Sequence, residues 1–280
     1  MNNSMISASA SMGSLQKKLD LLADNIANSN TVGYKRKTAI FEDILTNINP
    51  HLDDFNFSGR RTPLGFTQGW GAKLSTMQLD FSQGVLQQTG NATDIAIEGN
   101  GLFEVRTGTT LDSSPAVSRH GALQLMATGN GDSILVTNAG YPVVASVNGA
   151  DSFINVPSGY QLSVAADGKL TAIGSEGMPP IELGQLKLVQ ATKPELLQAV
   201  ADNLYGIPEN VNWTDVVSDV TGRPSSESGV AVRQGFVENS NVDMAEEMTD
   251  LVMVQRAYQL TARALSSSEQ MMGMANNLRA

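Results

Sequence analysis

Both ends of the chain carry apolar residues at alternating intervals of three and four, the spacing of a helix that packs along a continuous seam. Near the N-terminus the repeat runs without a break through Met5, Ala8, Met12, Leu15, Leu19, Leu22 and Ile26. Near the C-terminus one seam position recurs every seven residues at Met244, Leu251, Tyr258, Leu265 and Met272, with Val254, Thr261 and Ala275 in the alternate position. A seam sustained over this length favours coiled-coil packing over burial in a globular core.

Proline and glycine are concentrated in the middle of the chain. All ten prolines lie between Pro50 and Pro224, and only three of the 26 glycines fall in the first 40 or last 41 residues. Because both residue types interrupt helices, the ends can form long helices, which we expect over about 4–28 and 241–278. The middle is predicted to form strands and turns.

The C-terminal helix has signals for its start. Ser240 and Asp243 have the spacing of a capping box. Glu246 and Glu247 place negative charge in the first turns, where the helix dipole favours it. We therefore expect the helix to begin directly after Ser240.

Short runs of β-forming residues fill the middle of the chain. They read "TDIAIEG", "SILVT", "YPVVASV", "YQLSVAADGKLTAI" and "GQLKLVQ". Turn signals separate them, including Asp167-Gly168 at an expected hairpin tip, and their regular spacing is typical of an antiparallel β domain. The predicted fold is mixed α and β, with long N- and C-terminal helices forming a coiled-coil-like stalk and a central, mostly antiparallel β domain.

Four segments follow from this division. They are 1–40 (N-terminal helix), 41–90 (irregular extension or linker), 91–235 (β-rich domain) and 236–280 (C-terminal helix).

Charge and composition exclude several classes of protein. A net charge of −10 and a pI near 4.6 oppose binding to nucleic acid or anionic lipid. No cysteine is present, which removes disulfides and thiolate chemistry. The sequence contains no run of 18 apolar residues, so we expect no helix that spans a membrane. The first residues lack a basic and an apolar region, so we expect no cleaved signal peptide.

No residue pattern predicts catalysis, a cofactor or a metal. His51 and His120 are the only histidines, and a catalytic triad needs geometry rather than inventory. His51 lies near Asp53 and Asp54, where a solvated loop is favoured over a metal site. The glycine-rich runs "EGNGLF" and "TGNGDS" lack the spacing of phosphate-binding loops. We therefore predict that the protein is not an enzyme.

The stretch "DNIANSNTVGYKRK" (24–37) ends the first helix with asparagines, a glycine, a tyrosine and a basic cluster. Asparagine can satisfy backbone groups at a helix end and tolerates left-handed conformations. Gly33 permits a sharp turn out of the helix. For the cluster Lys35-Arg36-Lys37 two interpretations stay open: a solvated corner, or a contact with an acidic face of another subunit such as the Glu246-Glu247 region.

Four blocks in the same order resemble the flagellar rod and hook protein family, the axial proteins of the bacterial flagellum. They are "LLADNIANSNTVGYKRK", "FSQGVLQQTGNATDIAIEGNGLFEV", "SRHGALQLMATGNGDSILVTNAGYPVV" and "VRQGFVENSNVDMAEEMTDLVMVQRAYQLTARALSSSEQMMGMANNL". Hook proteins are longer, so the length resembles that of a rod protein of the distal-rod type or a related hook-basal-body protein. The central block departs from the family, because "SRHGALQL" replaces the usual Asp-Gly pair and aromatic residue.

This resemblance implies a structural rod subunit that assembles into a helical tube and transmits torque from motor to hook. Its implied partners are copies of itself, other axial proteins and the flagellar type III export apparatus. The implied location is the basal body, outside the cytoplasmic membrane. The predicted assembly interface comprises Met5, Met12, Leu15, Leu19, Leu22, Ile26, Met244, Leu251, Val254, Tyr258, Leu265 and Met272. The predicted signature turn comprises Asn25, Asn28, Asn30, Thr31, Gly33, Tyr34, Lys35 and Arg36.

Two alternatives remain from the sequence. One is a hook-type axial protein. The other is a freestanding extracellular β-rich binding or adhesion module, whose helices would form a closed hairpin within one monomeric chain.

Overall fold

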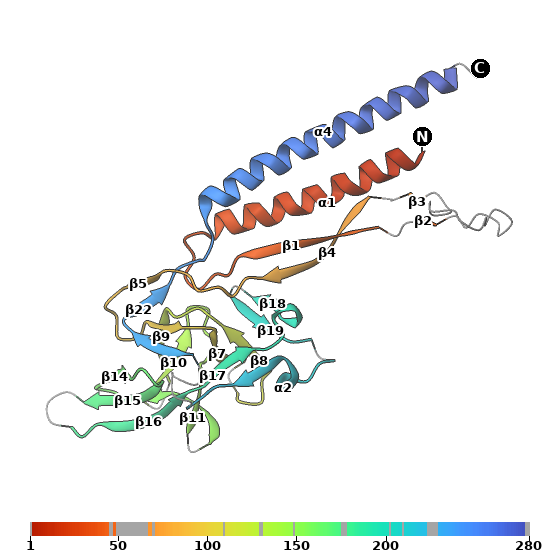
Figure 1. Ribbon diagram of the computed structural model, residues 1–280. Helices are drawn as coiled ribbons and strands as arrows, with labels where there is room; N and C mark the ends of the chain where they lie inside the picture. The colour runs from red at the N-terminus through yellow and green to blue at the C-terminus, as the bar shows by residue number, and fades with distance from the viewer. Residues whose placement is uncertain are drawn as a thin grey trace, which may run out of the picture. The chain divides into compact units, whose positions relative to one another are not determined.

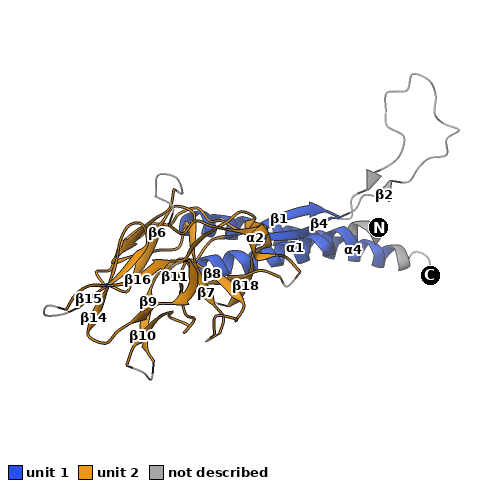
Figure 2. Cartoon of the chain, turned by 90° about the horizontal axis from the view of Figure 1, so that it is seen from below, with its two compact units in different colours: residues 1–26, 37–78, 244–280 blue, residues 27–36, 79–243 orange. Residues whose placement is uncertain are grey.

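The computed structural model describes residues 2–44, 47–48, 67–68, 71–108, 110–128, 131–147, 149–174, 178–201, 203–208, 210–222 and 229–277. The chain divides into two compact units (Figure 2). The helical unit comprises Met1–Ile26, Lys37–Gln78 and Met244–Ala280. The β unit comprises Ala27–Arg36 and Leu79–Asp243. His51 and the neighbouring aspartates lie outside the described residues.

The helical unit contains the two long helices that the sequence predicts. They are α1 (Asn2–Ala27) and α4 (Met244–Asn277), drawn side by side in Figures 1 and 2. Each lacks internal proline and carries one glycine, which explains why neither helix is interrupted. The prediction of helices at both ends of a mixed fold is confirmed.

The start of α4 differs from the prediction by three residues. Ser240 does not cap the helix. Its Oγ instead accepts a hydrogen bond from the Val242 N–H at 3.3 Å. The Asn241 side chain donates to the carbonyl oxygens of Asp80 and Ser82, at 2.9 and 3.2 Å. These bonds hold 240–242 in the β unit as an extended connection, so α4 begins only at Met244.

A strand pair lies where the sequence indicated an irregular segment over 41–90. Strand β1 (Lys37–Asp43) pairs with β4 (Ala72–Leu79) in a two-stranded sheet. Thr38 Oγ1 donates to the Gln78 carbonyl at 3.1 Å and the Ile44 N–H to the Gly71 carbonyl at 2.7 Å. Residue numbers rise on one strand as they fall on the other, so the pair is antiparallel. The short strands β2 (Asn47–Ile48) and β3 (Thr67–Gln68) also pair antiparallel.

Antiparallel sheets make up the β unit (Figure 1). The six-stranded sheet has the order β18 (Gln198–Ala201), β19 (Leu204–Gly206), β8 (Pro115–Ser118), β7 (Gly101–Arg106), β17 (Leu188–Ala191), β20 (Val217–Asp219). The five-stranded sheet has the order β12 (Ala150–Phe153), β11 (Val144–Val147), β16 (Ile181–Leu186), β15 (Lys169–Gly174), β14 (Tyr160–Val164). The three-stranded sheet has the order β13 (Asn155–Val156), β10 (Ser133–Thr137), β9 (Leu123–Ala127).

Smaller elements complete the β unit. Strand β21 (Ala231–Gln234) pairs with β6 (Ile95–Glu98), and β22 (Phe236–Glu238) pairs with β5 (Leu86–Gln88). The unit also holds the short helices η2 (Pro194–Leu196) and α2 (Trp213–Val216). The prediction of a mostly antiparallel β region is confirmed.

Two apolar cores stabilise the β unit. The larger includes Ile95, Phe103 and Leu170, and the smaller includes Leu102, Tyr205 and Val217. Burial of such side chains removes apolar surface from water, which is the main favourable term in folding.

The predicted hairpin tip at Asp167-Gly168 joins β14 to β15. Gly168 has a φ of +83° there, a conformation that glycine adopts without strain.

Candidate assembly site

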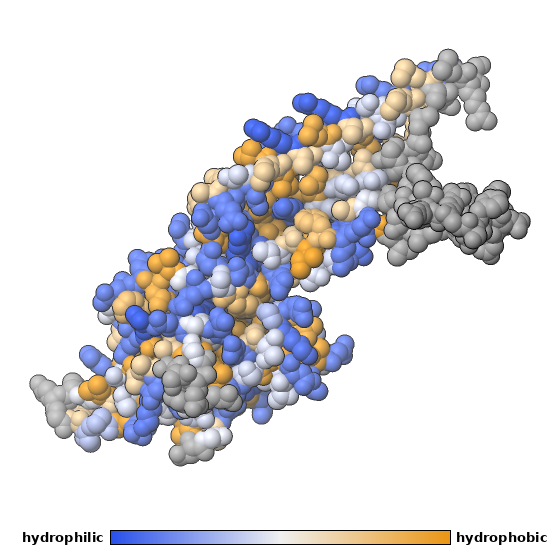
Figure 3. Space-filling model, viewed as in Figure 1, coloured by the Kyte–Doolittle hydropathy of each residue, from blue (hydrophilic) through white to orange (hydrophobic). Residues whose placement is uncertain are grey.

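Helix α4 carries a second apolar row that the seam analysis missed, here called the outer stripe. Its residues are Met253, Ala257, Leu260, Ala264, Met271 and Met274. The four large side chains keep much of their surface exposed: Met253 56%, Leu260 64%, Met271 48% and Met274 60%. Figure 3 shows apolar side chains exposed among polar ones along the helices. Scattered exposed apolar residues are ordinary, but a row interrupted only by Ser267 indicates an interaction surface.

The predicted seam residues lie on a different face of each helix. Leu22 and Val254 are buried. Met5, Ala8, Met12, Leu15, Leu19, Ile26, Leu251, Tyr258, Leu265 and Met272 are half-buried. Met244 is 42% exposed at the first position of α4. One chain therefore covers the seam only in part.

Polar residues complete the seam of α4. Glu247 and Ser268 occupy the alternate position between the larger seam residues, and Glu247 is fully buried. Glu247 and Ser268 are polar, so a search for apolar residues at seam positions could not find them. Only their spacing of seven and fourteen residues from Val254 and Thr261 would have suggested that they share this face.

Helix α1 has a further face directed at the β1–β4 pair. Its residues follow the same three-four spacing, and we call them the hairpin face: Ser7, Ser11, Ser14, Lys18, Leu21 and Asn25. The Ser14 Oγ donates to the Ala72 carbonyl at 2.6 Å. A Cβ added at Gly71 would lie 2.9 Å from the Ser7 carbonyl oxygen. The serines of α1 and the small residues Gly71 and Ala72 at the start of β4 thus allow the strand to approach the helix backbone closely.

Asn25 ties three elements of the helical unit together. Its Oδ1 accepts from the Lys37 N–H at 3.0 Å, and its Nδ2 donates to the Lys37 carbonyl at 2.9 Å. The same Nδ2 donates to Glu247 Oε2 at 3.1 Å. Asn25 and Glu247 are both fully buried. The Asn25 side chain therefore forms the two hydrogen bonds with Lys37 that the backbone of a neighbouring strand would otherwise form with β1. It also links α1 to the first turn of α4.

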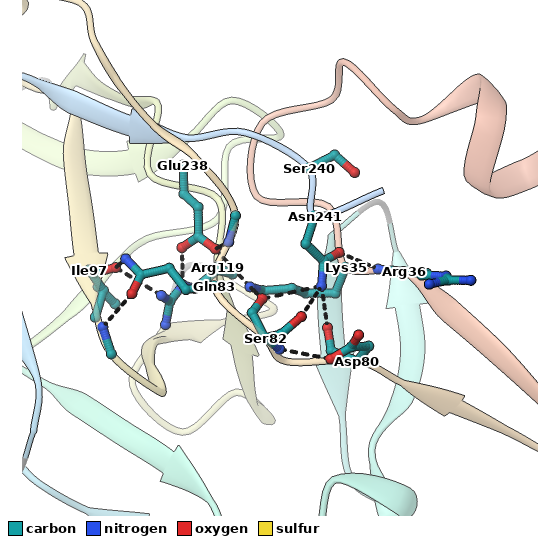
Figure 4. A network of polar contacts seen from close by, with 12 residues as sticks. Lys35, Arg36, Asp80, Ser82, Gln83, Ile97, Arg119, Glu238, Ser240 and Asn241 are labelled. Atoms are coloured by element: carbon teal, nitrogen blue, oxygen red, sulfur yellow. Dashed lines mark hydrogen bonds and ion pairs between the residues drawn. The ribbon is translucent and has the colours of Figure 1, made fainter. Parts of the chain in front are cut away.

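Within the β unit, Glu238 is the centre of a buried polar network, which we call the Glu238 junction (Figure 4). Its Oε1 receives hydrogen bonds from Lys35 Nζ at 2.7 Å and the Gly84 N–H at 2.8 Å. Its Oε2 receives one from Arg119 Nε at 2.6 Å. Its backbone carbonyl accepts from the Gly33 N–H at 2.7 Å. One carboxylate thus joins three distant segments of the chain to β22.

The cations of the Glu238 junction are satisfied by further backbone oxygens. Arg119 also donates to the carbonyls of Gly101 and Ile97, and Lys35 donates to the Ser82 carbonyl at 2.7 Å. Burial lowers the pKa of both Lys35 and Arg119, and the Glu238 carboxylate opposes the shift through its charge and hydrogen bonds.

For Lys35 and Glu247 these contacts correct the two interpretations of the basic cluster, whereas Arg36 and Lys37 are half-buried and Glu246 is exposed. Lys35 is 1% exposed and paired with Glu238 of its own chain, so it is neither solvated nor available to another subunit. Lys37 pairs with Asp24 at 2.5 Å. Glu247 is buried against Asn25, so it does not offer an exposed acidic face.

The remaining turn residues hold the chain as it leaves α1. Thr31 Oγ1 donates to Asn28 Oδ1 at 3.1 Å, and Tyr34 is buried. The Arg36 N–H donates to Asn241 Oδ1 at 2.8 Å. Asn30 is exposed.

In this turn Gly33 has a positive backbone φ, and the asparagines do not. Gly33 has a φ of +71°, as its expected role requires. The expected left-handed asparagines do not occur at this turn. Across the described ranges, Asn203 is the one non-glycine residue with positive φ.

Replacing Gly33 by alanine is expected to destabilise the β unit by about 3 kcal/mol, through backbone strain and a steric clash. A Cβ there would lie 2.7 Å from the Arg119 carbonyl oxygen and from the His120 backbone. Gly90 is the matched control, since its φ is +78° with no atom within 4 Å of an added Cβ. Gly90→Ala should cost about 1 kcal/mol, the strain alone. Urea unfolding measures both, and equal losses would contradict a crowded Gly33.

The described residues contain no cluster of three or more His, Cys, Asp or Glu that could hold a metal ion. No helix in the described part of the chain is long and apolar enough to span a membrane. His120 has its Nδ1 2.9 Å from the Val32 carbonyl oxygen, so this nitrogen donates a hydrogen bond to the turn after α1.

Models of two known families match the two ends of the chain. The model described as "Flagella basal body rod protein" matches residues 7–35, which include most of α1 and the turn after it. The model described as "Flagellar basal body rod FlgEFG protein C-terminal" matches residues 233–278, which include α4 and the Glu238 position. The class defined by these segments is that of flagellar rod proteins.

Full-length relatives are named as flagellar basal-body or hook-basal body proteins. The chain is 32% identical to the flagellar basal-body rod protein FlgG of Buchnera aphidicola subsp. Baizongia pistaciae, over 95% of each chain. It is 30% identical to FlgG of Borreliella burgdorferi, over 100% of this chain and 99% of the relative. It is 31% identical to the flagellar hook-basal body complex protein FlhP of Bacillus subtilis, over the full length of both. The chain belongs to the flagellar basal-body rod protein family.

Proposed function

We propose that this chain is a structural subunit of the flagellar rod that polymerises through α1 and α4 into a helical tube. The outer stripe is the observation that carries the proposal. It leaves Met253, Leu260, Met271 and Met274 about half exposed or more on a helix whose other apolar face already lies against α1. Exposed apolar side chains do not stabilise an isolated subunit. A neighbouring subunit that covers the outer stripe would remove this apolar surface from water and stabilise the assembly.

The incomplete seam supports the same conclusion. Tyr258, Leu265 and Met272 remain half-buried in one chain, so neighbouring copies can bury them further. A freestanding module with a closed helical hairpin would be expected to cover both apolar faces itself. The predicted coiled-coil-like stalk is thus completed only between subunits.

The contacts proposed here are heterologous, because a seam on one copy meets a different face on the next. Such contacts do not close into a dimer and build an open helical polymer. A tube of long helices joined along their lengths transmits torque through many side-by-side contacts. The Glu238 junction keeps the emerging chain ends fixed within the β unit.

Partners and location follow from the family. We infer that the chain assembles with copies of itself and with other rod and hook proteins in the basal body, outside the cytoplasmic membrane. Its delivery there is assigned to the flagellar type III export apparatus. No catalytic step is required for this function.

Electron microscopy of purified basal bodies tests the proposal. An epitope tag inserted directly after Gly131, an exposed residue of the β unit, should bind gold-labelled antibody along the rod. Label confined to the hook would support the hook-type alternative. Absence of the chain from basal bodies of motile cells would contradict a rod function.

A further inference from the structure

Half of the methionines of this chain lie in one helix. The sequence contains 12 methionines and no cysteine, so thioethers are its only sulfur groups. Six of the 12 belong to α4: Met244, Met248, Met253, Met271, Met272 and Met274. All of these except Met272 keep 42–60% of their surface exposed. Among the described residues, α4 therefore presents more oxidisable sulfur to solvent than the rest of the chain does.

The two apolar rows of α4 differ in where their sulfur lies. In the outer stripe, Met253, Met271 and Met274 supply three of the four large side chains. In the seam, the large residues between the two ends of the helix carry no sulfur: Leu251, Val254, Tyr258 and Leu265. Leucine and methionine have similar volumes and replace each other at low cost in packed interiors. Packing alone therefore does not require methionine in the exposed row.

We infer that Met253, Met271 and Met274 form an oxidation site, at which hydrogen peroxide converts the thioethers to sulfoxides and thereby prevents a neighbouring subunit from covering the outer stripe. The inference rests on the proposed function. It adds the chemical class of a reagent, a peroxide, that changes the outer stripe from an apolar to a polar surface.

The chemistry requires only the side chain and the peroxide. A lone pair of the methionine sulfur attacks one oxygen of hydrogen peroxide, so that an S–O bond forms and the O–O bond breaks. The leaving hydroxide takes the proton of the transferred oxygen and departs as water. The sulfur loses two electrons, which reduce the peroxide. Methionine sulfoxide reductases reverse the change, so the modification can act as a switch.

Sulfoxides at these positions would change the outer stripe without unfolding the helix. Each sulfoxide oxygen accepts hydrogen bonds, and in the free subunit water can supply them because the three side chains are exposed. Against the apolar side chains of a neighbour, the same oxygen would lose its water without gaining a donor, which costs free energy. The buried seam residue Val254 contains no sulfur, so the packing of α4 in the subunit is kept.

Rod assembly in the presence of peroxide tests the inference. The chain is produced from an inducible promoter while cells are exposed to a sublethal dose of hydrogen peroxide. Newly built basal bodies are counted relative to the untreated culture of the same strain. With the wild-type chain we expect a loss of about fivefold or more. With the stripe variant, which combines Met253→Leu, Met271→Leu and Met274→Leu, the loss should be less than about twofold, because the outer stripe then has no sulfur to oxidise.

A second triple variant is the matched control. It carries Met77→Leu, Met126→Leu and Met178→Leu, which replace methionines that are 53%, 48% and 51% exposed but lie outside α4. The three methionines of the stripe are 56%, 48% and 60% exposed, so the two variants remove similarly accessible sulfur. The control should lose basal bodies as the wild type does, since its outer stripe is still oxidised. Equal protection by both variants, or protection by neither, would contradict the inference.

Purified wild-type subunits provide a measurement that depends neither on assembly nor on variants. After peroxide treatment, peptide mass mapping should find sulfoxides at the three positions while circular dichroism stays unchanged. A dye that binds exposed apolar surface should then bind less, and methionine sulfoxide reductases should restore its binding. Unchanged dye binding with all three positions oxidised would overturn the inference, even if the stripe variant builds no rods in untreated cells. Absence of the wild-type chain from untreated basal bodies would instead contradict the proposed function.

Discussion

Replacing Glu238 by alanine is expected to lower the free energy of unfolding of the β unit by about 3–5 kcal/mol. The substitution removes the carboxylate from two buried cations at once, since Lys35 and Arg119 have side chains only 1% and 2% exposed. Their remaining carbonyl partners satisfy hydrogen bonds but do not neutralise charge. The energetic cost comes from leaving two desolvated charges without a counter-charge rather than from the loss of one contact.

Urea unfolding monitored by Trp213 measures this loss. Trp213 packs against the smaller core of the β unit, and a Trp70→Phe background removes the only other tryptophan. Glu98→Ala is the matched control, because it breaks an ion pair with Arg233 in which both side chains are about half exposed. This control should cost less than about 1 kcal/mol. Similar losses in the two variants would show that the Glu238 junction adds no buried electrostatic stabilisation.

Replacing Leu260 by aspartate is expected to abolish rod assembly and motility while leaving the subunit folded. Leu260 is the most exposed large side chain of the outer stripe, at 64%, so the charge stays in water in the free subunit. In the assembled tube the same charge would be buried against an apolar neighbour, at a cost of several kcal/mol for each contact. Motility in soft agar and the yield of rods measure the effect.

Gln259→Asp is the control for this variant. Gln259 is also exposed on α4, one residue earlier and off the stripe, and it introduces the same side chain into the same helix. It should leave motility close to that of the wild type. Circular dichroism of both purified variants should match the wild type. Full motility of Leu260→Asp would refute the outer stripe as an assembly surface.

The helices could be predicted closely because their signal is local. The expected limits of 4–28 and 241–278 compare with Asn2–Ala27 and Met244–Asn277. Heptad spacing and the absence of proline act over every turn of a helix, so many residues contribute to one prediction. The start of α4 was misplaced because the bonds of Ser240 and Asn241 are tertiary.

The strand pair β1–β4 could not be predicted for a related reason. Its two strands are separated by a long segment of turn-like composition, and β4 alternates between half-buried and exposed residues only over its first four positions. Contacts with the hairpin face of α1 position the strands, and those contacts are made by Ser14 and Asn25. A search for apolar periodicity ignores both residue types.

The site was predicted in part. Gly33 has the conformation expected of it, and the role of the seam in assembly stays a prediction. The burial of Lys35 was missed, because its partner Glu238 lies 203 residues further along the chain. Sequence spacing carries no information on such pairings. The outer stripe was detectable, since its spacing matches that of the seam, but only burial distinguishes the two rows.

The central claim is that the outer stripe is exposed in the subunit and buried between subunits in the rod. A side-chain-resolution electron cryo-microscopy reconstruction of the assembled rod tests it most directly. The account requires Leu260 and Met271 of each copy to contact apolar side chains of a neighbouring copy. A reconstruction in which both side chains face solvent or the tube lumen would contradict it.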